Sequence, residues 1–425
     1  MNLLQEVFRH EVYPALGCTE PTAVAYAASI AADAIGGNFQ SMTIKVDPGV
    51  FKNGMAVTVP KTNGEHGNLI AGVLGALIAE PDRKMQILDG ATDKKLEQAK
   101  QIVTTRKAAI ELMPTKTDLY IEIDLKTTSG TAKAIVAHEH TGLIFLETNG
   151  NILLNKETEK KTLTPSYREI LKSKSIANLV DCVSNISPED MAYLKKGIEM
   201  NCAVAEAGVH LKKVGYYLSD LMEKGLLQDD IFSSSKIMTA SASDARMAGL
   251  NYPVMASGGS GNQGIVATLV PYNIGRHFNI DEETILRSIA LSHLMNSFIK
   301  CFTGDLSPLC GCAIAAGVGA AVAIVYQQMG KDMEKITLAV NNLISDLGGM
   351  LCDGAKGGCA LKVVSSTDSA IRSAYMALNG HGITSIEGFV GQTAEETIIN
   401  LSKISAIGME KADDTMLGIM MAKQN

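Results

Sequence analysis

Five of the eight cysteines in this 425-residue chain stand where their thiols could do chemistry. Cys352 and Cys359 lie seven residues apart, and the intervening DGAKGG predicts a flexible loop that can fold both thiols around one centre. The pair Cys310 and Cys312 precedes them, at the start of a predicted helix. This spacing differs from the C-x-x-C of a zinc ribbon or a thioredoxin site.

Three thiolates converging from these segments could hold a metal centre. On an iron-sulfur cluster, three cysteine ligands leave one iron without a protein ligand, and an open metal position distinguishes catalytic from structural sites. Such an iron can act as a Lewis acid on a hydroxyl or thiol leaving group. The alternative interpretation is small buried residues, which we favour for Cys182, Cys202 and Cys301 because they lie in helical patterns.

The fifth cysteine, Cys18, lies in the segment GCTEP, directly before an alanine-rich helical pattern over residues 21–35. A thiol at a helix N-terminus can have a lowered pKa and react as a thiolate. Cys18 is therefore a candidate base or nucleophile.

A glycine-rich segment precedes an apolar helical run and predicts a site for an anion such as a carboxylate. Glycines let the backbone approach a ligand, and the N–H groups of a helix start favour negative charge. The alternative is a linker or a helix cap, since the segment fits neither the phosphate loop nor the dinucleotide fingerprint. The candidate binding residues are Ser257, Gly258, Gly259, Ser260, Gly261, Asn262 and Gln263.

Polar residues at two predicted strand ends form a third group. Lys52 and Asn53 lie in DPGVFKNG, and His66 lies in VPKTNGEHG. Strand ends present polar side chains to clefts, so these three could bind a carboxylate or an amino group. The alternative is hairpin-turn chemistry at the Asn-Gly pairs.

The elements that must position these residues predict an α+β fold. Residues 1–165 form an N-terminal α/β-sheet domain, because short runs of Val, Ile and Thr at period two alternate with turn residues. Residues 166–425 form a larger all-helical domain that carries the cysteines, and residues 155–174 are the best linker candidate. A first helix over 3–35 packs either on the sheet or on the helical domain. The predicted strands are SMTIKV, MAVTV, DLYIEIDL, TAKAIVAH and GLIFLE, the predicted helices in the first domain are 67–80 and 93–107, and the predicted helix starts in the second are Ser187, Ser243, Asp281 and Thr393.

Composition narrows the function classes. A net charge of -7 argues against nucleic-acid binding, so the expected ligand is a small molecule. The N-terminus lacks the layout of a signal peptide, and the longest apolar run, 313–326, is too short to span a bilayer. We therefore expect a cytoplasmic protein with reduced thiols and no membrane contact. The small residues of that run suit close helix packing, which makes a homodimer plausible.

Taken together, GCTEP, DPGVFKNGMAV, ASGGSGNQG, CGC and CDGAKGGCA make the chain resemble the L-cysteine desulfidases and the α-chain of iron-sulfur L-serine dehydratases, including their uncharacterised bacterial homologues. The likeness to the desulfidases runs over nearly the whole chain. The likeness to the serine dehydratases is strongest between the glycine-rich segment and the last cysteines.

The resemblance implies a lyase that needs no pyridoxal phosphate. It implies a [4Fe-4S] cluster on Cys312, Cys352 and Cys359, with Cys310 as the alternative first ligand, and Cys18 as the base. Residues 257–263 would take the substrate carboxylate. The expected reaction is β-elimination of L-cysteine to hydrogen sulfide, pyruvate and ammonia, and the first alternative is L-serine with the same mechanism. Two further alternatives are a zinc-binding or redox-sensing protein that is not an enzyme, and a protein that only binds amino acids.

Overall fold

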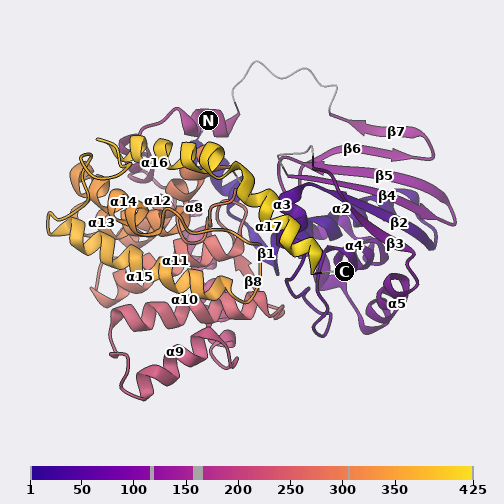
Figure 1. Ribbon diagram of the computed structural model, residues 1–425, viewed down its shortest axis with the longest axis horizontal. Helices are drawn as coiled ribbons and strands as arrows, with labels where there is room; N and C mark the ends of the chain where they lie inside the picture. The colour runs from indigo at the N-terminus through magenta and orange to yellow at the C-terminus, as the bar shows by residue number, and fades with distance from the viewer. Residues whose placement is uncertain (1, 115–118, 157–165, 305–306, 424–425) are drawn as a thin grey trace.

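The computed structural model describes residues 2–114, 119–156, 166–304 and 307–423. It consists of a part built on a β-sheet and a larger helical part, which lie side by side (Figure 1). The α+β class expected from the sequence is confirmed. The boundary expected after residue 165 falls at the edge of 157–165, which lies outside the described residues, as does much of the predicted linker.

The first part contains a mixed six-stranded sheet. Its strands have the order β3-β2-β4-β5-β6-β7; β2 and β3 are parallel, and the other neighbours are antiparallel. The period-two runs therefore mark strands, with one exception. Met55–Val59 was expected to be a strand, but it forms only an isolated bridge between Thr58 and His66. The strands are β2 (Phe39–Val46), β3 (Ala108–Leu112), β4 (Tyr120–Thr127), β5 (Gly130–Ala137), β6 (Leu143–Thr148) and β7 (Asn151–Asn155).

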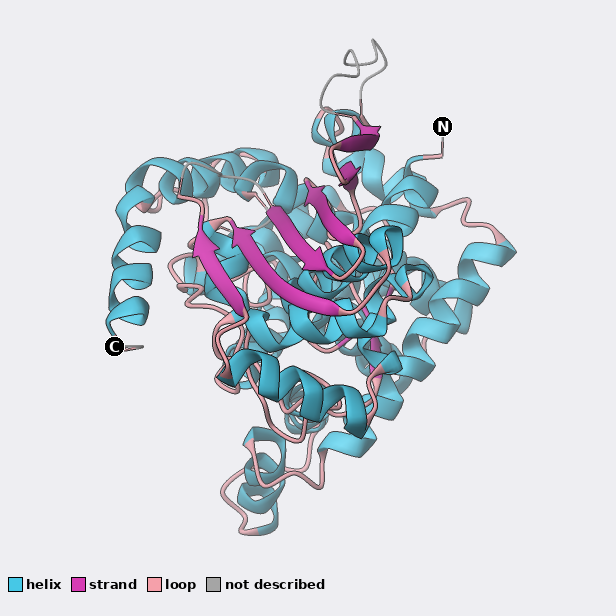
Figure 2. Cartoon of the chain, turned by 90° about the vertical axis from the view of Figure 1, so that its right-hand side faces the viewer, coloured by secondary structure: helices cyan, strands magenta, loops and turns pink. Residues whose placement is uncertain are grey.

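Helices cover one face of this sheet, and Figure 2 shows the strands in front of them. The helix α2 (Thr19–Ile35) crosses the inner faces of β4, β5 and β6, and α4 (Asn68–Ile78) packs against both α2 and β2. These two helices come very close, since a Cβ on Gly75 would lie 2.0 Å from the carbonyl oxygen of Ala25. The other helical segments of this part are α3 (Pro48–Gly54), the 3-10 segment η1 (Pro81–Gly90) and α5 (Asp93–Thr104).

The second part is helical, and two of its helices, Glu282–Thr303 and Ala315–Met329, are buried over most of their length. Ser187, Asp281 and Thr393 are the N-caps of α8, α12 and α16, as the sequence predicts. The predicted start at Ser243 is wrong, because α10 begins after its N-cap Asp230 and runs through that position. The helices are α6 (Tyr167–Lys172), α7 (Ile176–Val183), α8 (Pro188–Gly208), α9 (Val214–Glu223), α10 (Ile231–Met247), α11 (Gly261–His277), α12 (Glu282–Thr303), α13 (Ala315–Met329), α14 (Met333–Leu347), α15 (Cys359–Leu378) and α16 (Ala394–Lys403).

The N-terminal segment joins the two parts, and it is not the single helix expected over 3–35. The helix α1 (Leu3–Glu11) ends before Pro14, and Gly17 adopts a φ of 71° that favours glycine, so the chain turns before α2 begins. The apolar side of α1 belongs to the core of the helical part, whereas α2 belongs to the core of the sheet part. Between them, β1 (Pro14–Leu16) pairs antiparallel with β8 (Pro253–Met255) from the helical part.

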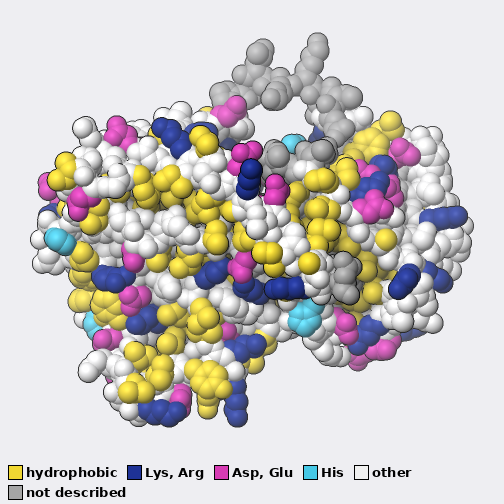
Figure 3. Space-filling model, viewed as in Figure 1, with side chains coloured by type: hydrophobic (Ala, Val, Ile, Leu, Met, Phe, Trp, Pro, Cys, Tyr) yellow, Lys and Arg dark blue, Asp and Glu magenta, His cyan; other side chains and the backbone are white. Residues whose placement is uncertain are grey.

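The C-terminal end of the chain crosses back in the opposite direction. After the π-helical turn η2 (Ile404–Gly408), α17 (Glu410–Ala422) leaves the helical part and lies along α3 (Figure 1). Asp413 on α17 accepts a 2.6 Å hydrogen bond from Lys52 on α3. Acidic and basic side chains are interspersed over the face seen in Figure 3. None of the described helices has the length and apolarity needed to cross a membrane.

Candidate active site

The β1–β8 pair places Cys18 beside the glycine-rich segment. Cys18 lies two residues after the end of β1, and the glycine-rich segment follows β8. Two further backbone hydrogen bonds hold the segments together: the Ala256 N–H donates to the carbonyl of Tyr13 (2.9 Å), and the Gly259 N–H donates to that of Glu11 (3.1 Å). Residues separated by more than half of the chain thus meet through a short piece of sheet.

These segments enclose a cavity at the junction of the two parts, with about 730 Å³ of free space including its mouth. All five cysteines singled out from the sequence line it. Six of the predicted ligand-binding residues line it as well: Lys52, Asn53, Gly259, Ser260, Asn262 and Gln263. Of the other four predicted, Ser257, Gly258, Gly261 and His66, none lines the cavity.

Backbone pairing brings the distant cysteines together. The Cys310 N–H donates to the carbonyl of Met350 (2.9 Å), and the Cys352 N–H donates to that of Pro308 (2.7 Å), so the two cysteine segments run antiparallel. Cys312 follows in the turns before α13, and Cys359 is the first residue of α15. The convergence is therefore imposed by the fold and does not depend on the flexible loop alone.

The donor set of this cavity fits an iron-sulfur cluster. Thiolates are the usual ligands of such clusters, and each of them binds a different iron atom. All described cysteines are free, and four thiols, those of Cys310, Cys312, Cys352 and Cys359, surround one cavity. Within the described residues, no three His, Cys, Asp or Glu side chains lie close enough to hold a single metal ion.

The choice between Cys310 and Cys312 as first ligand stays open, because both line the cavity. Their thiols are hydrogen-bonded to each other, which lowers the pKa of Cys310 and raises that of Cys312. A Cβ on Gly311, the residue between them, would lie 2.5 Å from the side-chain nitrogen of Gln263. The segment that carries the two cysteines therefore lies against the first turn of α11.

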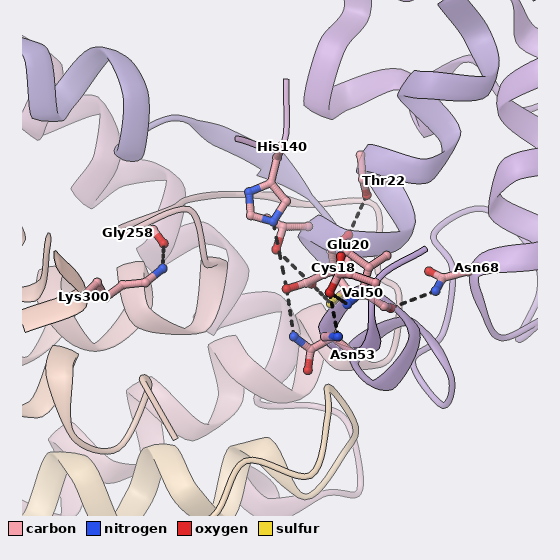
Figure 4. A network of polar contacts seen from close by, with 12 residues as sticks. Cys18, Glu20, Thr22, Val50, Asn53, Asn68, His140, Gly258 and Lys300 are labelled. Carbon is pink, nitrogen blue, oxygen red and sulfur yellow. Dashed lines mark hydrogen bonds and ion pairs between the residues drawn. The ribbon is translucent and has the colours of Figure 1, made fainter. Parts of the chain in front are cut away.

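Cys18 is the N-cap of α2, but its thiol is bound to a carboxylate. The Cys18 thiol donates a 3.0 Å hydrogen bond to Glu20, which also accepts from Thr19 (3.0 Å) and from Asn53 (3.0 Å) (Figure 4). Burial raises the pKa of Cys18 well above its usual value, and the charge of Glu20 raises it further. This is opposite to the lowered pKa expected from the helix N-terminus.

Glu20 is the ionised partner of this pair. Burial opposes its ionisation, but the charge of His140 and the hydrogen bond from Cys18 outweigh burial and lower the pKa of Glu20. The Nε2 atom of His140 lies 4.0 Å from the carboxylate, and both side chains point into the same space as Cys18 (Figure 4). The side chains arranged here can therefore exchange a proton with a bound molecule.

The glycine-rich segment is a tight turn followed by the N-terminus of α11. Gly258 and Gly259 have φ values of 55° and 71°, which only glycine adopts readily. The buried Ser257 does not face the cavity; its hydroxyl contacts the Nδ1 atom of His293 (2.8 Å) and fixes the turn. Lys300 donates to the carbonyl of Gly258 (Figure 4). These contacts hold the turn in place, so that the first residues of α11 face the cavity.

Of the three candidate polar residues in the first part, two line the cavity and one does not. Lys52 and Asn53 lie on α3, in a helical turn instead of the hairpin that the Asn-Gly pair also allowed. Gly54 is needed there because a Cβ would overlap the side chain of Asn68. His66 lies elsewhere and contacts the hydroxyl of Thr58 (3.2 Å).

Sequence reasoning missed five charged or titratable residues of the cavity wall: Glu20, His140, Arg246, Lys300 and Lys362. Glu20 stands inside GCTEP, two residues after Cys18, so that motif already contained the signal. His140 comes from the turn between β5 and β6, and Arg246 from the last turn of α10. Nothing in their own sequence surroundings marks these two.

The chain belongs to the serine dehydratase alpha chain family, whose model matches residues 82–418. This match includes the glycine-rich segment and the cysteines at positions 310, 312, 352 and 359, and it begins after Cys18. A UPF0597 protein of Geobacter sulfurreducens is 60% identical over 100% of this chain and 99% of its own. A UPF0597 protein of Elusimicrobium minutum is 52% identical over 100% of both. No solved structure matches the chain.

Proposed function

We propose that this protein is a [4Fe-4S]-dependent lyase that eliminates the β-substituent of L-cysteine, giving hydrogen sulfide, pyruvate and ammonia. The observation that carries the proposal is the single cavity. It combines four cysteine thiols, a thiol–carboxylate pair and a helix N-terminus. The family match supports the lyase class.

The cluster would be held by Cys352, Cys359 and one of Cys310 and Cys312, with Cys312 as our first choice. A bound cluster with one iron free of protein ligands would supply a Lewis acid for the departing sulfur or oxygen. The protein itself must hold the substrate with its α-proton near a base and keep water away. The buried walls of the cavity suit this task.

We assign the role of base to the Cys18–Glu20 pair. Because the Cys18 thiol is protonated and donates to Glu20, it can accept the α-proton only as its own proton passes to the carboxylate. The electron pair of the broken C–H bond then forms the C=C bond, and the C–S bond breaks to release hydrosulfide. The aminoacrylate tautomerises and hydrolyses in water to pyruvate and ammonia.

L-Serine is the second candidate substrate, and the name of the matching family favours it. L-Cysteine is preferred because GCTEP and the segment carrying Lys52 resemble the desulfidases and both contribute to the cavity. The two amino acids differ only in the leaving atom. Anaerobically reconstituted full-length protein should therefore be given each of them, with sulfide and pyruvate measured.

The cluster assignment has its own test. Cys352→Ala should lose most of the bound iron and acid-labile sulfide, whereas Cys182→Ala, on α7 and not part of the cavity wall, should keep both. Cys18→Ala should keep the cluster and lose turnover. Zinc without sulfide in the wild-type protein, or a cluster without turnover of either amino acid, would contradict the proposed function.

A further inference from the structure

Arg246 is a buried cation in the wall of the cavity. It lies in the last turn of α10 and is 2% exposed. Its Nε atom has no hydrogen-bond partner, and its guanidinium forms no ion pair within the part of the chain that the structure describes. Two other cations of the wall differ in this respect, since Lys52 is paired with Asp413 and Lys362 with Asp353.

The guanidinium lies directly against the start of α11. A Cβ on Gly261, the first residue of that helix, would lie 2.2 Å from Arg246 Nε, so glycine makes the approach possible. The N-cap Ser260 makes no side-chain hydrogen bond to the first turn of α11. The unpaired N–H groups and the positive end of the helix dipole therefore lie beside a positive side chain.

Such an arrangement is unfavourable without an anion, because a buried charge needs a partner. Two buried amide oxygens at the same place, Asn262 Oδ1 and Gln263 Oε1, also have no hydrogen-bond partner in the described structure. As acceptors they suit the ammonium group of an amino acid and not its carboxylate. The charge of Arg246 also acts on Cys18, Glu20 and Cys359. An anion held by Arg246 would thus be close to both the proposed base and a cluster cysteine.

We propose that Arg246 and the first turn of α11 together bind the α-carboxylate of the substrate and restrict the site to ligands with that group. The substrate class rests on the proposed function, but the carboxylate site itself does not require turnover. A guanidinium can give a carboxylate two parallel hydrogen bonds, and the helix N–H groups can satisfy its remaining lone pairs.

The test compares binding of L-alanine and of L-alaninamide to the full-length protein by calorimetry. Neither compound has a leaving group, and only L-alanine carries a carboxylate. Wild-type protein should bind L-alanine more tightly. Arg246→Gln should weaken L-alanine binding by about 10- to 100-fold, the range for a hydrogen bond to a charged group, and should leave L-alaninamide binding unchanged. Arg246→Lys should restore part of the loss, and Arg276→Gln, at the exposed end of α11, should change neither.

Equal binding of the two ligands by the wild-type protein, or no binding of L-alanine, would overturn the inference even if the variants fail to fold. If Arg246→Gln lost binding of both ligands, the residue would have a purely structural role, and the inference would be overturned as well. The proposed function can fail independently of this inference. If the protein distinguishes the two ligands through Arg246 but releases no pyruvate from L-cysteine or L-serine, the carboxylate site stands and the lyase activity is refuted.

Discussion

His293 makes the turn that carries the glycine-rich segment sensitive to acid. Its ring is fully buried on α12, where it contacts the hydroxyl groups of Ser257 (2.8 Å) and Thr268 (3.5 Å). Burial lowers the pKa of His293 from 6.5 to about 3. The folded chain therefore binds fewer protons than the unfolded chain between these two values, so the free energy of unfolding must fall as the pH falls.

The size of this effect follows from the two pKa values. Each unit of pKa difference is worth about 1.4 kcal/mol, so His293 contributes roughly 5 kcal/mol to the free energy of unfolding. This contribution is fully present above pH 6.5 and is lost by about pH 3. Between pH 7 and pH 4 the loss should be about 3 kcal/mol. His293→Gln removes the titrating group, so the stability advantage of the wild type over this variant should shrink by that amount.

Urea unfolding at pH 7 and pH 4, followed by far-UV circular dichroism because the chain has no tryptophan, measures this difference. Other titrating groups are common to both proteins and cancel. His210→Gln is the matched control, because His210 is exposed after α8. The difference in unfolding free energy between the wild type and this variant should be the same at pH 7 and pH 4. An advantage of the wild type over His293→Gln that is equal at both pH values would refute the reasoning.

Three further changes test the site and its support. Glu20→Gln should lower the pKa of Cys18, because the charge of Glu20 helps to raise it. The pH dependence of Cys18 alkylation, read by peptide mass spectrometry, measures this pKa; an alkylation profile identical to that of the wild type would contradict the pairing. Asp47→Ala should cost about 2–4 kcal/mol in urea unfolding, because three backbone N–H groups that its carboxylate accepts from would lose their partner; a loss below 1 kcal/mol would argue against these bonds. Gly75→Ala should lower the melting temperature by several degrees, because its Cβ would lie 2.0 Å from the Ala25 carbonyl oxygen; an unchanged melting temperature would contradict that packing.

Much of the fold could be predicted because local patterns and tertiary structure agree. The strand β4 has its apolar residues at period two, and α8 begins at Pro188, directly after its N-cap Ser187. The prediction failed where a local pattern had no partner in space. Met55–Val59 alternates like a strand, but it makes only the bridge at Thr58. The pattern alone could not reveal that no neighbouring strand would be available.

The candidate site was predictable only for residues that stand in unusual sequence. Cys352 and Cys359 stand out through the glycines around them, and Cys18 through GCTEP. Arg246 lies near the end of an ordinary helical pattern, so its burial against Gly261 arises entirely from the way α10 and α11 pack. The pKa of Cys18 was expected in the wrong direction because burial and a neighbouring carboxylate depend on three-dimensional surroundings.

The pairing of β1 with β8 also decides when a growing chain could become active. Residue 16 leaves the ribosome long before residue 253, with which it must pair, and Cys359 follows later still. Until then Cys18 has neither the turn at residues 256–260 nor the other thiols beside it. A nascent or truncated chain therefore holds the proposed base without the rest of the catalytic apparatus, so competence arises only once synthesis has passed α15.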